Sequence, residues 1–153
     1  MKLIYNPVFL EHDTGRHPEN RRRLNPFKDL PVTSLENGEK YLNLIHPPAY
    51  VDWIRQASLE ERTIDAETPL SIGSFQAACH AVGASILAAE TGDFALIRPP
   101  GHHAYPAKAS GFCIFNNVAV ASQYLVNQGK KVLILDFDGH LGDGTEAIFY
   151  HSD

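Results

Sequence analysis

One stretch decides how the rest of this chain is interpreted: Lys131-Val-Leu-Ile-Leu-Asp-Phe-Asp-Gly-His-Leu-Gly-Asp-Gly144. It begins as a short apolar run and ends in acids, a histidine and glycines. The apolar part, residues 132–135, predicts a strand buried on both faces, as in a parallel sheet. The polar residues that follow then lie at the carboxyl edge of the sheet, where open α/β sheets bind ligands.

Two side chains in this stretch have the chemistry of metal ligands. Asp138 and His140 are one residue apart, and on an extended backbone such residues point to the same side. A carboxylate oxygen and an imidazole nitrogen together offer two ligands for zinc or a similar ion. Asp136 shares that side and can hold a neighbouring group. The stretch alone favours this interpretation no more than an ordinary strand exit with solvated acids.

A second polar strand exit, Arg98-Pro-Pro-Gly-His-His-Ala-Tyr-Pro106, carries two adjacent histidines. It follows a predicted strand at residues 94–97, and its prolines stiffen the backbone before His102 and His103. Histidine suits general acid–base chemistry because its unperturbed pKa is about 6.5. A histidine pair alone indicates only a polar loop. Its significance depends on whether it meets the residues that follow the strand at 132–137.

The order of the predicted elements defines the fold class. Strands are expected at residues 3–5, 94–97 and 132–137, and helices at 49–57, from Ser71 or Ser74 to 91, from Asn116 or Asn117 to about 128, and at 145–150. Strands that alternate with helices predict an α/β fold with a mostly parallel sheet. Neighbouring strands lie about 5 Å apart, so the two polar exits can face each other at one sheet edge.

Composition bounds the function classes. The chain has 153 residues, of which 44% are hydrophobic and 20% charged, enough for one domain with a core. A formal net charge of −5 does not indicate the basic surface that a nucleic-acid-binding protein needs. No apolar run reaches the roughly 18 residues of a membrane span, and no signal peptide is indicated. Two cysteines give no disulfide framework, which fits a cytoplasmic location.

Three ordered motifs together resemble the histone deacetylase superfamily. They are the Arg98–Pro106 stretch, Gly111-Phe-Cys-Ile-Phe-Asn-Asn117, and Leu135-Asp-Phe-Asp-Gly-His-Leu-Gly-Asp-Gly-Thr145. The superfamily includes bacterial acetoin-utilization and acetylpolyamine amidohydrolase proteins. The resemblance implies a three-layer arginase/deacetylase α/β fold with one catalytic zinc. It also implies that residues 1–153 form the amino-terminal part of a single deacetylase domain, because family members are about twice as long.

The resemblance assigns a role to each candidate residue. Asp138 and His140 match two zinc ligands, and the backbone around them would hold a structural potassium ion. The expected catalytic residues are the paired histidines and the carboxylates behind them: His102, His103, Asp136 and Asp143. The expected substrate-binding residues are Glu67, which stands where the family usually has Asp, together with Gly111 and the channel-wall residue Phe112.

The implied reaction is hydrolysis of an acyl amide by a metal-activated water. His103 would take the proton from the water and later protonate the leaving amine. The expected substrates are acetylated lysine, acetylpolyamine or another small acyl-amine. In the family, the third zinc ligand and the tyrosine that stabilises the oxyanion lie beyond the position of Asp153. Impaired activity and self-association through an exposed sheet edge are therefore expected of these residues alone.

Two alternatives remain from the sequence. In the first, the chain is a non-catalytic half-domain that binds a metal or a partner. In the second, which has less support, it is a phosphotransferase of the haloacid dehalogenase type. The second alternative rests on Leu135-Asp-Phe-Asp-Gly139, which resembles the motif of that class. It leaves the histidine pair unexplained. Zinc-dependent loss of acetyl groups, as opposed to magnesium-dependent release of phosphate, distinguishes the two enzyme classes.

Overall fold

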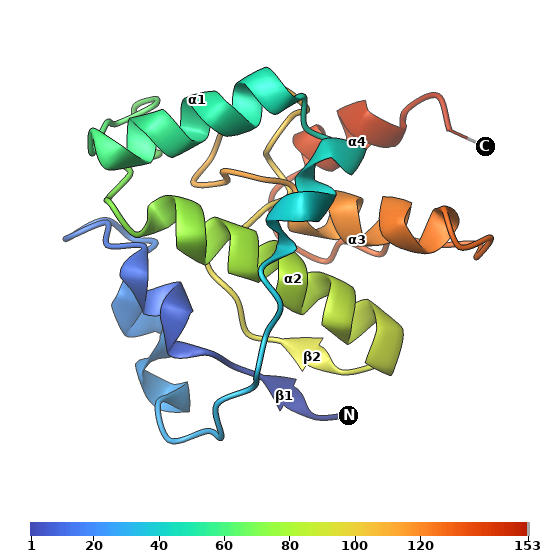
Figure 1. The fold of residues 1–153 in the computed structure, drawn as a ribbon, viewed down its shortest axis with the longest axis horizontal. Coiled ribbons are helices and arrows are strands. Elements are labelled where there is room, and N and C mark those ends of the chain that lie inside the picture. The colour runs from blue at the N-terminus through green and yellow to red at the C-terminus, as the bar shows by residue number, and fades with distance from the viewer. Residues whose placement is uncertain (153) are drawn as a thin grey trace.

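The long helix α2 (Ser74–Thr91) is the centre of the computed structural model, which describes residues 1–152. Figure 1 shows α1 (Pro48–Leu59) on one side of it and α3 (Asn117–Val126) on another. Small residues let neighbours approach: a Cβ added to Gly83 would lie 2.1 Å from the Glu36 carbonyl oxygen. The glycine therefore permits close packing of the 3-10 helix η3 (Gly38–Leu44) and the residues just before it against α2.

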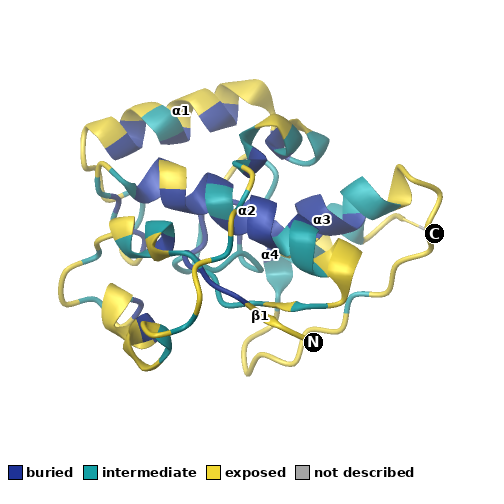
Figure 2. Ribbon diagram, turned by 60° about the horizontal axis from the view of Figure 1, so that its bottom comes forward, coloured by how far each residue is buried: buried dark blue, intermediate teal, exposed yellow. Residues whose placement is uncertain are grey.

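The predicted helices form where capping and burial favour them. Pro48 occupies the first turn of α1, where no backbone N–H is needed, and Gly92 ends α2 in a left-handed conformation. Asn116 caps α3 by accepting a hydrogen bond from the Ala119 N–H. Much of α2 is buried, as its colour in Figure 2 shows. The interior that the helices enclose also includes Phe115, which is fully buried. The remaining helices are η1 (Pro7–Glu11), η2 (Arg21–Phe27) and α4 (Asp143–Phe149).

The sheet is parallel, as predicted, but small. Strands β1 (Leu3–Ile4) and β2 (Phe94–Ala95) pair in parallel, with Leu3 opposite Phe94. The connection between them contains α1 and α2, and α2 lies between the strand pair and α1 (Figure 1). This is the strand–helix–strand arrangement that the alternating pattern indicates. No helix within residues 1–152 combines the length and apolar character needed to span a membrane.

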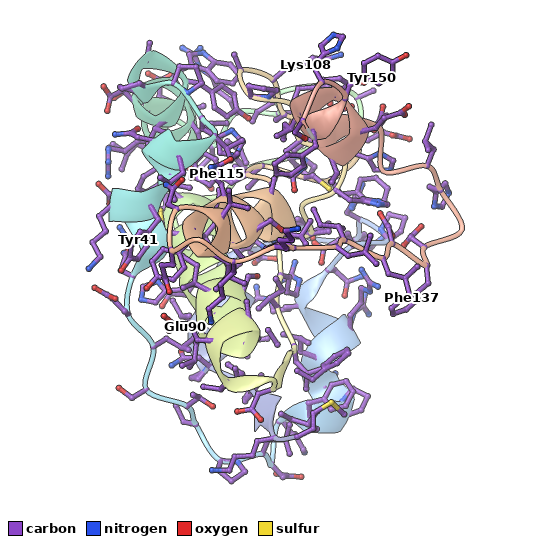
Figure 3. All side chains as sticks on the ribbon, turned by 90° about the vertical axis from the view of Figure 1, so that its right-hand side faces the viewer. Tyr41, Glu90, Lys108, Phe115, Phe137 and Tyr150 are labelled. Carbon is purple, nitrogen blue, oxygen red and sulfur yellow. The ribbon has the colours of Figure 1, made fainter. Side chains whose placement is uncertain are left out.

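The third predicted strand is wrong in one respect: residues 132–137 are extended but belong to no sheet. Leu133 is 92% exposed, and Leu135 and Phe137 project outward with it, as Phe137 does in Figure 3. Ile134, on the opposite face, is half-buried. A strand buried on both faces needs pairing strands and a second covering layer, and residues 1–152 provide cover on one face only. The apolar run indicates that this segment can be buried, but residues 1–152 do not bury both of its faces.

Candidate active site

The histidine loop, defined here as residues 98–104, is held from several directions. The His102 carbonyl accepts a hydrogen bond from the Thr145 N–H at 3.0 Å, and the Ala104 carbonyl accepts one from the Asn116 side chain at 3.1 Å. The Asn117 amide donates to the Pro99 carbonyl at 3.1 Å. Residues of α3 and α4 therefore fix the backbone that carries both histidines, which is the rigidity expected of a catalytic platform.

A buried ion pair anchors the start of the loop. The Arg98 guanidinium contacts both carboxylate oxygens of Glu19, at 2.7 and 2.8 Å, and also donates to the Phe9 carbonyl at 2.9 Å. Both side chains are 2% exposed. A bidentate pair with an additional hydrogen bond satisfies charges that would otherwise be costly to bury. It ties the loop to a segment 79 residues earlier in the chain.

Each histidine has its own carboxylate. The Nδ1 atom of His102 lies 2.9 Å from Asp136, and that of His103 lies 2.6 Å from Asp143. The two imidazole centroids are 4.0 Å apart. A carboxylate at Nδ1 favours the tautomer whose Nε2 is unprotonated and able to accept a proton.

The two predicted metal ligands lie beside the histidines. The His140 imidazole is 6.2 Å from that of His103, centroid to centroid, and its Nδ1 is 3.0 Å from an Asp138 oxygen. The same Asp138 oxygen accepts the His140 N–H at 2.8 Å. Both side chains are exposed, His140 by 82% and Asp138 by 50%. The pair lies beside the histidines, on the extended segment that belongs to no sheet within residues 1–152.

Hydrogen bonding makes the three carboxyl groups stronger acids. The Asp138 N–H and then His102 lower the pKa of Asp136, and the His140 backbone and side chain lower the pKa of Asp138. Burial opposes ionisation of Asp143, but hydrogen bonds from His103 and Tyr105 outweigh it, so its pKa is also lowered. All three are therefore anionic at neutral pH, as orienting or metal-binding carboxylates need to be.

A cavity of about 580 Å³ joins the predicted residues. Seven of the nine candidates line it, while Asp136 and Asp143 stand behind the histidines. The lining candidates are Glu67, His102, His103, Gly111, Phe112, Asp138 and His140. Phe112 packs edge-on against His17, with ring centroids 4.6 Å apart. The structure thus brings together residues from four separate stretches of sequence, although their individual roles stay predictions.

Gly111 is required at the wall of this cavity for two reasons. Its φ of +53° lies in the left-handed region, and an added Cβ would be 2.6 Å from Cδ2 of His103. Neither the backbone conformation nor the space suits a larger residue. The glycine therefore lets the Gly111–Phe112 backbone approach the imidazole closely.

The donor chemistry at Asp138 and His140 suits zinc, which accepts both oxygen and imidazole ligands. Catalytic zinc sites use three protein ligands, however, and residues 1–152 contain no group of three or more side chains placed to hold a metal. The residues present therefore fit two of the three protein-ligand positions of such a site.

Three residues at the site were not predicted from the sequence. Glu19 and Arg23 line the cavity, and the Tyr105 hydroxyl bonds to Asp143. Glu19 and Arg23 lie in a polar segment about 80 positions before the histidine loop, so only their location in the fold reveals them. Tyr105 was visible as part of the second polar exit, but nothing in its spacing indicates which group its hydroxyl contacts.

The comparisons with known proteins agree with this arrangement. A model of the histone deacetylase domain matches residues 16–153. A probable deacetylase of Archaeoglobus fulgidus is 35% identical over 99% of this chain and 48% of its own length. Histone deacetylase 5 of Arabidopsis thaliana is 33% identical over 97% of this chain and 28% of its own. The crystal structure of the HDA15 HD domain superposes with a TM-score of 0.88 at 31% identity, over 99% of this chain and 50% of that one.

The fold and its paired histidine–aspartate dyads thus define a domain of the arginase/deacetylase class. The chain belongs to the histone deacetylase family. It spans about half the length, or less, of the relatives named above. Membership of this family sets aside the haloacid dehalogenase alternative.

Proposed function

We propose that these residues supply the acid–base half and two metal ligands of a zinc-dependent deacetylase. The observation that carries the proposal is the convergence of both His–Asp dyads, Asp138 and His140 on one 580 Å³ cavity. Asp138 and His140 would hold the zinc together with a ligand from outside residues 1–152. Bound there, zinc would polarise the acyl carbonyl and acidify a water molecule.

The chain's own residues would provide proton transfer and substrate alignment. His103, oriented by Asp143, takes the proton of the attacking water at Nε2 and returns it to the leaving amine. His102 with Asp136 offers a second oriented imidazole beside it. Phe112 and Gly111 form a wall for the apolar stem of an acyl-lysine or acylpolyamine, and the Glu67 carboxylate at the rim is suited to a substrate N–H.

The test is hydrolysis of an acetyl-lysine peptide and of an acetylpolyamine by a purified protein that carries these residues together with a third zinc ligand, with and without added zinc. Activity that requires zinc and falls by at least a factor of about 10² in the His103→Ala variant supports the proposal, because general acid–base catalysis contributes about that much. Zinc-dependent turnover that is unchanged by this substitution would eliminate the assigned base. Release of phosphate from a phosphate ester with magnesium would point to a different enzyme class.

The exposed extended segment favours a second candidate, a non-catalytic half-domain that binds a partner, here a second copy of itself. Antiparallel pairing of two copies about Ile134 would place Lys130 of each copy opposite Asp138 of the other, an attractive cross-strand pair. It would also cover Leu133 and Leu135. Light scattering should then give a dimer that Lys130→Glu weakens. A monomer over the whole concentration range would remove this candidate.

A further inference from the structure

Asp143 differs from the other dyad carboxylate in receiving a side-chain hydroxyl. One of its oxygens lies 2.6 Å from Nδ1 of His103, and the other accepts a hydrogen bond from the Tyr105 hydroxyl at 2.9 Å. The Gly144 N–H adds a third contact at 3.0 Å. In the His102 dyad, by contrast, the second oxygen of Asp136 accepts only the Asp138 N–H, which belongs to the exposed segment. The two dyads are therefore supported differently.

The Tyr105 ring is itself held in place. Its backbone N–H donates to the Lys108 carbonyl at 2.9 Å, which closes a tight turn directly after the histidine loop. The Lys108 ammonium lies over the ring, 5.5 Å from its centroid. A hydroxyl on a restrained ring can orient a carboxylate, whereas one on a mobile side chain would share its hydrogen bond with water.

We propose that Tyr105 is a positioning residue for the proposed base, His103. By holding the outer oxygen of Asp143, it keeps the inner oxygen aimed at Nδ1–H of His103, so that Nε2 stays unprotonated and available. This inference rests on the proposed function only in calling His103 the base, since the hydrogen-bonded chain itself is a property of these residues. The carboxylate also raises the pKa of Tyr105, which keeps the hydroxyl protonated and able to donate at neutral pH.

The test compares Tyr105→Phe with a matched control, Tyr124→Phe. The Tyr124 hydroxyl also donates to an exposed carboxylate, Glu90, at 2.8 Å, but outside the cavity. In metal-free protein with ¹⁵N-labelled histidine, the nitrogen chemical shifts report the tautomer of each neutral imidazole, and His103→Gln assigns its signals. We expect the ratio of the Nδ1–H to the Nε2–H tautomer of His103 to fall about tenfold in Tyr105→Phe and to stay unchanged in Tyr124→Phe.

A kinetic measurement on the same zinc-loaded protein that tests the proposed function adds the consequence for catalysis. We expect kcat for an acetyl-lysine peptide to fall about tenfold in Tyr105→Phe with KM unchanged, because the hydroxyl acts on the base and not on the substrate. An unaltered His103 tautomer ratio overturns the inference whatever the activity. If the wild-type protein with its third zinc ligand hydrolyses no acyl-amine, the proposed function fails, and the tautomer ratio still decides the role of Tyr105.

Discussion

The two regions that meet at the cavity are built in opposite ways. The histidine loop is anchored by a buried ion pair and by side chains of α3 and α4, whereas the segment carrying Asp138 and His140 is extended, exposed and unpaired within residues 1–152. The half of the site proposed to transfer protons is therefore preorganised by residues of this chain. The half proposed to bind a metal lies beside it, on a segment that has no sheet partner within residues 1–152. Stability should depend on the first region and barely on the second.

The largest effect is expected where the histidine loop is anchored. Glu19→Gln leaves the Arg98 guanidinium buried without a charge partner, so we expect the free energy of unfolding to fall by about 3–5 kcal/mol. Urea denaturation measures it. The control is Asp13→Asn, which breaks the exposed ion pair with Arg21 and should change stability by about 1 kcal/mol or less. Equal losses in the two variants would contradict the proposed difference between the regions.

Acid should weaken the same anchored region through His46. This buried imidazole lies 2.9 Å from the Pro106 carbonyl and accepts the Asn116 N–H at Nε2, so protonation would remove an acceptor. Burial lowers its pKa to about 4, against 6.5 for an unperturbed group.

As the pH decreases, His46 of the unfolded chain binds a proton before His46 of the folded chain does. The free energy of unfolding therefore falls between about pH 6.5 and pH 4, and His46 causes no further loss below about pH 4. The loss from His46 should be about 3 kcal/mol. Urea midpoints across this range test it, because His46→Gln should flatten the slope. His12, whose pKa is likewise lowered to about 4 chiefly by burial, leaves part of the slope in place. A variant with the full wild-type slope would exclude His46 as a source.

The glycine beside His103 offers an intermediate effect. Gly111→Ala forces a left-handed alanine and a contact with the imidazole, whereas Gly92→Ala, at φ +73°, adds the same strain with no atom within 4 Å of the new Cβ. The control should cost about 1–2 kcal/mol. Gly111→Ala should cost more and should shift the His103 ring signals in NMR spectra. Equal decreases in the free energy of unfolding of the two variants would show that the contact with His103 does not contribute to the cost of Gly111→Ala.

The smallest effect on stability is expected on the exposed segment. Asp138→Asn should change the free energy of unfolding of the metal-free chain by less than about 0.5 kcal/mol, as for other exposed positions. The same substitution should weaken zinc binding at least tenfold, measured by calorimetry, because a ligand is lost. Asp13→Asn again serves as a control, with zinc affinity unchanged. Strong destabilisation by Asp138→Asn would mean that the segment is packed more firmly than its exposure indicates.

Particular residues show what the sequence determines by itself. The parallel sheet follows from the alternating order of strands and helices, and the span of α2 up to Gly92 and the Asn116 cap follow from local signals. The motifs also predicted which side chains would gather at one cavity. The strand at residues 132–137 was wrong because an apolar run records how much burial a segment tolerates, not whether neighbouring strands are present. Glu19 and Tyr105 escaped prediction because their partners, Arg98 and Asp143, are distant in sequence.

The central claim is that one half of the site is rigid and the other half is unsupported. Amide hydrogen exchange of the metal-free chain, followed residue by residue, tests it most directly. We predict slow exchange at Ala104, Asn116 and Thr145, whose backbone N–H groups bond within the anchored region, and exchange near the rate of an unstructured peptide at Val132–Phe137. Equal protection of the two regions would contradict the account.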